Sequence, residues 1–190
     1  MLNEILFEYQ NLVYKVDSRC QELEQRHRQH LVCQPGCSQC CEVERTVLAI
    51  EAYVVEQRLR SLSPERIKRL RKLYRNNDDV CPLLLRDRCV IYTARPIICR
   101  THGLPILYRE AARSFVDYCR LNFTKLPETH IFPASDILDM NDFNVELIQL
   151  DKKFAEYVLR TRWRPDQRRS LKSILFEFDA SPRSRRTRRR

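Results

Sequence analysis

The sequence predicts a mainly α-helical domain around an irregular, cysteine-rich metal-binding centre, and three observations support this prediction. Glycine occurs only twice in 190 residues, where average usage is about 7%, and the abundant Leu, Glu and Arg favour helices. Apolar residues recur at helical spacing both early and late in the chain. Eight of the nine cysteines fall between residues 33 and 119, four of them within nine residues. A chain of this length can form one domain with a real core.

A long amphipathic helix is predicted over residues 2–30. Apolar side chains repeat there at helical spacing, and Glu, Arg and Gln occupy the other face. The apolar stripe consists of Leu2, Ile5, Leu6, Tyr9, Leu12, Val13, Val16, Cys20 and Leu23. We expect Cys20 on this stripe to act as a small buried hydrophobe rather than as a ligand.

Two further helices are predicted before the middle of the chain. Residues 47–62 again show apolar side chains at helical spacing. Ser63-Pro64-Glu65 then supplies an N-cap, a proline at the first helical position and an acid in the first turn. The helix that begins there should end near residues 76–79, where Asn and Asp are concentrated.

The segment that follows is expected to be less regular. Residues 81–92 predict a short β-hairpin, or two extended segments around a turn. A short helix is expected from Thr93 through Cys99, whereas residues 101–134 carry Pro105, Pro127 and Pro133, which break regular structure.

The C-terminal part returns to helical spacing. Ser135-Asp136 can cap a long helix that runs to about Arg160, and a last helix carries Leu171 and Ile174. The resulting division has an N-terminal amphipathic helix, a cysteine-cluster core, C-terminal helices packed on that core and a disordered arginine-rich tail. Their ranges are 1–32, 33–120, 121–180 and 181–190.

The charge of the chain is concentrated at its end. The formal net charge is +10, but the last ten residues hold six arginines and no acid, so the other 180 residues carry 29 basic and 25 acidic side chains. A general basic nucleic-acid face is therefore not predicted. The tail could contact an acidic protein, or nucleic acid without sequence specificity, since it lacks aromatic residues for base stacking.

The N-terminal residues do not resemble a targeting segment. Met1–Gln10 contains two glutamates and no basic residue, unlike the basic start of a signal peptide. No apolar run approaches the roughly 20 residues that span a bilayer. We expect a cytoplasmic protein with no membrane contact.

The cysteines are difficult to explain by core packing. Thiolates this close together repel one another unless a positive charge lies between them, and soft thiolates bind zinc, copper(I) and iron–sulfur clusters. In a reducing compartment, dense cysteines indicate metal ligands rather than disulfides, and the odd total argues against a complete disulfide framework. The predicted ligands are Cys33, Cys37, Cys40, Cys41, Cys81, Cys89, Cys99 and Cys119.

Spacing alone leaves the number of metal centres open. Gln34-Pro35-Gly36-Cys37 fits a type II turn. In an extended segment Cys40 and Cys41 would point opposite ways, so they could serve different centres. The eight thiols could form two four-sulfur sites, or one cluster with additional thiols.

Other polar residues near the cysteines each allow two interpretations. His102 could be a ligand, but a lone histidine is more often a surface or supporting group. Arg45, Arg95 and Arg100 could offset the negative charge of thiolate-bound metal, and Arg95 could instead pair with a carboxylate or a backbone carbonyl. Tyr92 is expected to pack over the cluster.

The order and spacing of these residues resemble a known family. Cys33-x3-Cys37-x2-Cys40-Cys41, then Cys81-Pro82, Cys89, the run Tyr92-x2-Arg95-Pro96-x2-Cys99-Arg100 and Cys119 are similar to the CxxCxxCC family of YkgJ-like cysteine-cluster proteins, which are described as zinc- or iron-chelating. The first gap here has three residues where the family motif has two. The resemblance covers about residues 33–120 and implies that the eight cysteines are its metal ligands.

The leading hypothesis is a metal-binding protein with an iron–sulfur cluster or zinc, acting in electron transfer, metal handling or support of a partner enzyme. One alternative is a zinc-stapled structural or interaction module. Another is a cluster-dependent enzyme, because a related cysteine region occurs in flagellin lysine N-methylases. The sequence shows no catalytic constellation beyond the cysteines, so it leaves open whether the protein is an enzyme.

Overall fold

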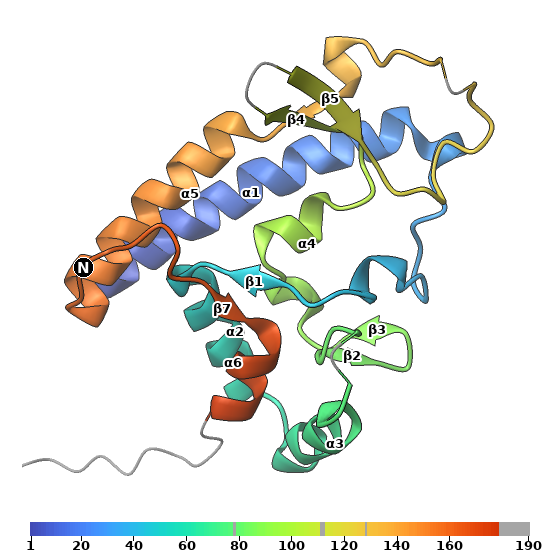
Figure 1. Cartoon of the computed structure of the whole chain (residues 1–190). Helices are drawn as coiled ribbons and strands as arrows, with labels where there is room; N and C mark the ends of the chain where they lie inside the picture. Colours follow the sequence, from blue (N-terminus) through green and yellow to red (C-terminus); the bar gives the residue numbers. More distant parts are fainter. Residues whose placement is uncertain (78, 111–112, 128, 179–190) are drawn as a thin grey trace, which may run out of the picture.

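The computed structural model describes residues 1–77, 79–110, 113–127 and 129–178, and it confirms the mainly α-helical fold (Figure 1). The predicted arginine-rich tail at 181–190 lies outside the described residues. Two long helices, α1 (Leu2–Arg26) and α5 (Asn141–Phe154), lie side by side along one edge of the molecule. The helices α2 (Ala49–Arg60), α3 (Pro64–Tyr74) and α6 (Leu171–Glu177) gather on the other side, with α4 (Ile97–Thr101) between the two groups.

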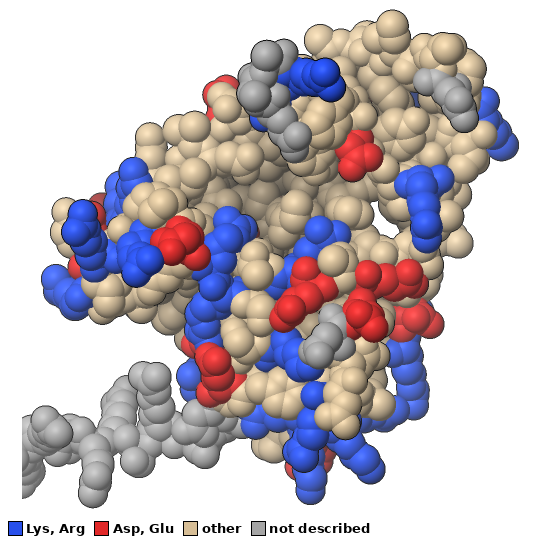
Figure 2. All heavy atoms as spheres, viewed as in Figure 1, with Lys and Arg blue, Asp and Glu red and all other residues tan. Residues whose placement is uncertain are grey.

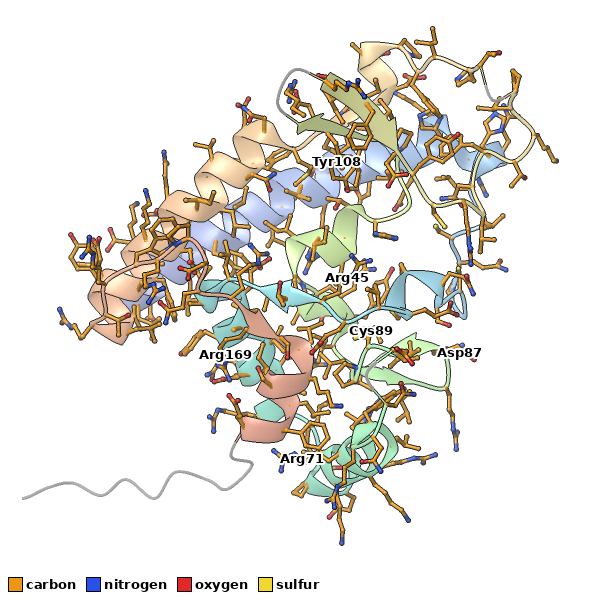
Figure 3. All side chains as sticks on the ribbon, in the orientation of Figure 1. Arg45, Arg71, Asp87, Cys89, Tyr108 and Arg169 are labelled. Carbon is orange, nitrogen blue, oxygen red and sulfur yellow. The ribbon has the colours of Figure 1, made fainter. Side chains whose placement is uncertain are left out.

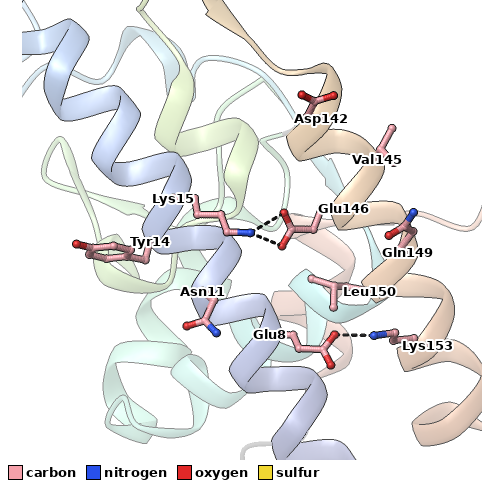
Figure 4. A pocket seen from close by; sticks show the side chains of 10 residues that line it. All are labelled: Glu8, Asn11, Tyr14, Lys15, Asp142, Val145, Glu146, Gln149, Leu150 and Lys153. Atoms are coloured by element: carbon pink, nitrogen blue, oxygen red, sulfur yellow. Dashed lines mark hydrogen bonds and ion pairs between the residues drawn. The ribbon is translucent and has the colours of Figure 1, made fainter.

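The first hydrophobic core joins α1, α5 and α4. The apolar stripe predicted for α1 is buried there, with Leu12, Val16 and Leu23 fully enclosed, and Phe154 of α5 packs against it. Cys20 is buried in this core, as expected. On the outer side, the Lys15–Glu146 and Glu8–Lys153 ion pairs bridge the two helices (Figure 4). Both pairs are solvent-exposed, so they contribute little compared with the buried stripe.

The second hydrophobic core joins α2, α3 and α6. Leu59, Leu70 and Ile174 are fully buried at its centre, and Cys81 belongs to it. The Ser63 hydroxyl accepts the Arg66 N–H at the start of α3, as the Ser-Pro-Glu signal predicts. Figure 2 shows Lys and Arg gathered over the end of the molecule where α3 lies, consistent with the many basic residues of that helix.

The hairpin predicted at 81–92 is present. Strands β2 (Leu84–Leu85) and β3 (Arg88–Cys89) pair antiparallel, with Leu84 opposite Cys89. Arg86 and Asp87 form the two-residue loop with φ of 52° and 56°, as a tight right-twisted hairpin requires. A 3-10 turn at Tyr92–Ala94 then leads into α4, so the short predicted helix begins at Ile97 rather than Thr93.

A second hairpin lies in the region expected to be irregular. Strands β4 (Ile106–Glu110) and β5 (Arg113–Asp117) pair antiparallel, and β6 (Leu138–Asp139) joins β4 in parallel. Two short strands, β1 (Thr46–Val47) and β7 (Arg169–Ser170), also pair antiparallel and bring α2 beside α6.

The predicted start of the long C-terminal helix was wrong. Ala134–Asp136 is a separate 3-10 turn, and the chain then enters β6 before α5 begins at Asn141, whose N–H is accepted by Asp139. The pairing of Leu138 with Ile106 outweighs the local capping signal. The helix widens into a π-turn at Ala155–Leu159 and ends at Arg160, which has a φ of 58°.

Two buried carboxylates position the helices around the middle of the molecule. Glu51 is 2% exposed and accepts the backbone N–H groups of Leu48 and Ile97, so it ties the start of α2 to the start of α4. Asp151 of α5 accepts from Ile50 N–H and from the Trp163 indole. Among the described residues, no helix combines the length and apolar character needed to cross a membrane.

Candidate metal centre

Five of the eight predicted ligands come together around the β2–β3 hairpin, where Figure 3 labels Cys89. They are close enough that each either affects the pKa of another member or has its own pKa affected by one. We call these residues the inner set: Cys40, Cys41, Cys81, Cys89 and Cys99.

Backbone hydrogen bonds hold three members of the inner set in place. The Cys81 N–H donates to the Cys41 carbonyl at 2.7 Å, which joins segments 40 residues apart. The Leu84 N–H donates back to the Cys81 carbonyl, and the antiparallel pairing then brings Cys89 opposite Leu84. Cys41, Cys81 and Cys89 are therefore positioned by the main chain and do not depend on flexible contacts.

Cys99 reaches the same place from α4. The first turn of that helix is anchored by the Glu51 bond to Ile97 N–H. The Arg100 guanidinium donates to Asp17 of α1 at 2.6 Å and to the Thr93 and Arg95 carbonyls at 2.7 Å each. Arg100 therefore fixes α4 against α1.

The inner thiols are electrostatically unfavourable as free thiolates. Burial raises the pKa of Cys99 to about 12, with a further increase from the charge of Cys89. The pKa of Cys40 is raised because its thiol donates a hydrogen bond to Cys41, and burial adds to this. Cys41 receives that bond, which lowers its pKa, but its own bond to Cys81 and burial bring the pKa to about 11. Only a bound cation would make several thiolates stable here together.

Arg45 is a cation beside the inner set. Its guanidinium lowers the pKa of Cys99, against the larger effect of burial, and donates to the Cys40 carbonyl at 3.4 Å. Arg45 also lies 3.5 Å from His102 Nδ1. Burial and this positive neighbour lower the pKa of His102, so the ring is neutral near pH 7. The contact of His102 is with Arg45, which fits a supporting role better than ligation.

The other three cysteines form an outer set, Cys33, Cys37 and Cys119. Burial raises the pKa of Cys33, and the charges of Cys37, Cys119 and Cys40 raise it further. The predicted turn is present, because the Cys37 N–H donates to the Gln34 carbonyl and Gly36 has a φ of 101°. The charge of Cys40 raises the pKa values of both Cys33 and Cys89, so Cys40 lies close to members of both sets.

Asn122 organises the outer set, and no sequence pattern marks it. Its side chain is 1% exposed. The amide donates to the Gly103 carbonyl at 2.7 Å and lies 3.5 Å from the Cys33 sulfur, while its oxygen accepts the Val32 N–H. Gly103 has a φ of 103°, and a Cβ there would meet the Cys33 sulfur at 3.1 Å. Glycine is therefore required by both backbone and space.

The donor set suits zinc or iron, because eight thiols with one histidine at the margin match the soft ligands that these ions take in four-sulfur sites. Within the described residues, however, no three Cys, His, Asp or Glu side chains stand in an arrangement ready to hold an ion. The backbone brings the thiols into the same region, and metal binding would require their side chains to turn toward a shared point.

Tyr92 differs from the sequence expectation, and Arg95 fits one of its two interpretations but not the other. The Tyr92 side chain is 62% exposed and its ring stacks on the Arg95 guanidinium at 3.8 Å, so it does not pack over the cluster. The Arg95 Nε is buried without a hydrogen-bond partner among the described residues, in place of the expected carboxylate or carbonyl. The other interpretation of Arg95, that it offsets thiolate charge, agrees with the effect of its guanidinium, which lowers the pKa of Cys89 against the larger effect of burial.

Comparison with known families supports the metal assignment. Residues 32–120 match the CxxCxxCC family, described as "Putative zinc- or iron-chelating domain". This range contains all eight predicted ligands, so the resemblance seen in the sequence is confirmed over that part of the chain. Comparison with curated proteins and with solved structures found no match.

Proposed function

We propose that the CxxCxxCC domain of this chain chelates zinc or iron through its cysteine thiolates, and that this is the protein's biochemical role. The observation that carries the proposal is the convergence of Cys41, Cys81, Cys89 and Cys99 from four separate segments. Burial helps to raise the pKa values of Cys41, Cys89 and Cys99. Thiolates gathered at this place are costly without a cation, and a bound cation would account for their convergence.

The arrangement favours two neighbouring four-sulfur sites. The pKa of Cys41 is affected by hydrogen bonds with Cys40 and Cys81 and by the charge of Cys89. The charge of Cys40 also raises the pKa of the outer residue Cys33. We therefore assign the first site to the inner thiols other than Cys40, and the second site to the outer set together with Cys40. The two site compositions are Cys41, Cys81, Cys89 and Cys99, and Cys33, Cys37, Cys40 and Cys119.

The solvent exposure of the cysteine side chains determines whether a partner molecule can reach the proposed metal centre. Cys40, Cys41, Cys89 and Cys99 are each only half-buried, so a partner molecule can approach the thiols without unfolding of the chain. This access suits electron transfer, handing over of metal or support of a partner enzyme. A four-thiolate iron–sulfur cluster would supply one-electron redox chemistry, and zinc would supply a redox-inert structural link.

Metal analysis combined with a visible spectrum tests the proposal. The full-length chain should be purified without oxygen and without chelators, and its zinc, iron and copper measured per chain. We expect one to two four-sulfur centres per molecule. Brown colour with broad visible absorbance that bleaches on reduction identifies iron–sulfur, and colourless protein with stoichiometric zinc identifies zinc. Protein that contains none of these metals would rule out chelation.

A second candidate function, a zinc-stapled structural module, is favoured by one observation. Cys81 is part of the second hydrophobic core, and Cys41 and Cys89 pack against it, so metal bound there would hold α2, α3 and the hairpin together. This version predicts that a chelator unfolds the domain and that no redox signal exists. A reversible redox wave in the bound state would exclude it.

A further inference from the structure

A cavity of about 340 Å³ lies between α1, α2 and the 3-10 turn at Tyr92–Ala94. Its volume is within the range of small-molecule sites. A larger hollow of about 850 Å³ lies between α1 and α5, but its charged groups pair with one another, as Lys15 does with Glu146 and Glu8 with Lys153 (Figure 4). The smaller cavity differs because one of its cations, Arg95, forms no ion pair within the described part of the chain.

The walls of the smaller cavity are mostly apolar. Leu6 and Val13 of α1 face Val54 of α2 and Ala94 of the turn across it, with tyrosine rings from both helices. No carboxylate lines the cavity among the described residues, whereas two arginines do. This combination of an apolar body and an excess of positive charge suits a ligand with one anionic group.

Arg95 is the cation that can bind such a group. Within residues 1–77, 79–110, 113–127 and 129–178, its buried Nε has no hydrogen-bond partner. The planar guanidinium is held at 3.8 Å over the Tyr92 ring. A buried N–H without an acceptor is costly, so the protein leaves the hydrogen-bonding capacity of this guanidinium unused. A ligand carboxylate bound to the guanidinium would form charge-assisted hydrogen bonds.

The second arginine of the cavity, Arg100, already has hydrogen-bond partners within the protein. Arg100 donates to Asp17, to the Thr93 carbonyl and to the Arg95 carbonyl. It therefore fixes the backbone of the turn, including Arg95 itself, before any ligand arrives. Preorganisation of this kind reduces the entropy lost on binding.

Two groups near Arg95, Tyr9 and Glu24, affect which ligands the cavity can bind. Burial raises the pKa of Tyr9 well above its usual value, so its phenol stays neutral and remains a donor. Glu24 is a carboxylate near Arg95. Burial raises the pKa of Glu24, and the positive charge of Arg95 lowers it by a smaller amount. No ion pair joins these two described side chains, and Glu24 lies outside the cavity lining, so the guanidinium remains available to a ligand.

We propose that this cavity binds a small organic monocarboxylate with an aromatic or branched apolar body, its carboxylate held by the Arg95 guanidinium with Tyr9 as a second donor. The apolar body lies against Leu6, Val13 and Val54. This proposal goes beyond metal chelation and does not depend on it.

The cavity lies beside the cysteine centre. Arg95 lines the cavity, and its guanidinium is close enough to Cys89 to lower the pKa of that thiol against the larger effect of burial. An anion bound to Arg95 would therefore lie near the thiols without contacting them. This position suits a ligand that modulates the centre.

Saturation-transfer NMR with benzoate tests the proposal on the full-length chain as purified, without removal of any metal it carries. We expect saturable binding with a Kd on the order of 1 mM. Benzamide, a neutral analogue of the same shape, should bind at least about tenfold more weakly, because it cannot form the charge-assisted bond. Inorganic sulfate should compete poorly, since it lacks the apolar body.

Variants locate the binding to this cavity. Arg95→Gln should weaken benzoate binding about tenfold or more, and Tyr9→Phe by about threefold. Val54→Phe fills the apolar wall and should abolish binding while leaving Arg95 in place. Arg28→Gln removes an equal charge from an exposed position outside the cavity and should leave the Kd unchanged. Metal content and melting temperature of each variant establish that it is folded.

Three results would overturn the proposal. One is benzoate binding that is the same in Arg95→Gln and Val54→Phe as in the unmodified chain. Another is equal binding of benzamide and benzoate, and the third is full competition by sulfate. Should Arg95→Gln fail to fold, Val54→Phe alone decides the outcome. Metal analysis of the same samples is independent of these results, so this inference and the chelation proposal can fail separately.

Discussion

The inner and outer cysteine sets are held by different kinds of structure. Backbone hydrogen bonds and the second hydrophobic core position Cys41, Cys81 and Cys89. The outer set lies on loops and depends on one buried amide, Asn122, for its link to the rest of the chain. The comparison indicates that folding fixes the backbone of the inner set, whereas the backbone of the outer set relies on a few local contacts.

Complete metal removal should produce the largest difference between regions. Chelation under reducing conditions should increase amide hydrogen exchange in residues 81–99 by at least about a hundredfold, because the free energy of binding a structural ion is also folding free energy. Exchange in α1 and α5 should change little, since their shared core contains no proposed ligand. A uniform increase over the whole chain would contradict separate stabilisation of the two cores.

Loss of a single ligand should distinguish the two sets. We expect Cys99→Ser to remove the inner metal and lower the melting temperature by about 10 °C, because three thiols remain in a buried, constrained position. Cys37→Ser should lower it by less than half as much. Metal per chain and calorimetric melting measure both effects. Equal losses in the two variants would show that the sets form a single site.

Glu51 should stabilise the position of α4, the helix that carries Cys99 of the inner set. Glu51→Ala leaves the Leu48 and Ile97 N–H groups without their buried acceptor and should cost about 3 kcal/mol of unfolding free energy. Glu51→Gln keeps one acceptor oxygen and should cost about half of that. Denaturant unfolding provides the measurement, and a loss below about 0.5 kcal/mol for the alanine variant would refute the anchoring role.

Asn122 and Gly103 should have smaller effects, confined to the outer set. Asn122→Ala removes three contacts that join separate loops and should cost about 2 kcal/mol. Gly103→Ala places a methyl group 3.1 Å from the Cys33 sulfur at a positive φ and should cost about 1–2 kcal/mol. Both should reduce metal at the outer site while the inner site stays occupied. Loss of inner metal instead would make the sets interdependent.

A surface ion pair should matter least. Lys15→Gln breaks the bridge to Glu146, whose partners are 54% and 35% exposed, and should change the unfolding free energy by about 0.5 kcal/mol or less. Metal content should remain the same as in the unmodified chain. A larger effect, measured by the same denaturant unfolding, would show that the α1–α5 contact depends on charge and not on the buried stripe.

Local signals predicted much of the fold. The apolar stripe of α1, the cap at Ser63 and the β2–β3 hairpin all arise from residues close in sequence. The β4–β5 hairpin escaped prediction because no Gly or Asn-Gly turn marks it. Ser135-Asp136 carries a helix cap signal, but pairing of Leu138 with β4 decides the conformation there.

The sequence indicates which cysteines are candidate ligands, but it does not indicate how they are grouped in space. The spacing of the cysteines predicts eight candidate ligands, because thiols packed so densely along a chain are typical of metal ligands. It could not group them into an inner and an outer set, since that depends on contacts such as Cys81 with Cys41. Asn122 contacts Val32 across 90 residues, and no local pattern encodes such a contact. The structural role of Arg100 arises in the same way, through Asp17 of α1.

X-ray absorption at the zinc and iron edges, on full-length protein purified without oxygen, tests the central claim most directly. Thiolate chelation predicts a bound metal whose first shell contains sulfur alone, at about 2.3 Å for zinc. A first shell dominated by nitrogen or oxygen, or a sample without metal, would contradict the account.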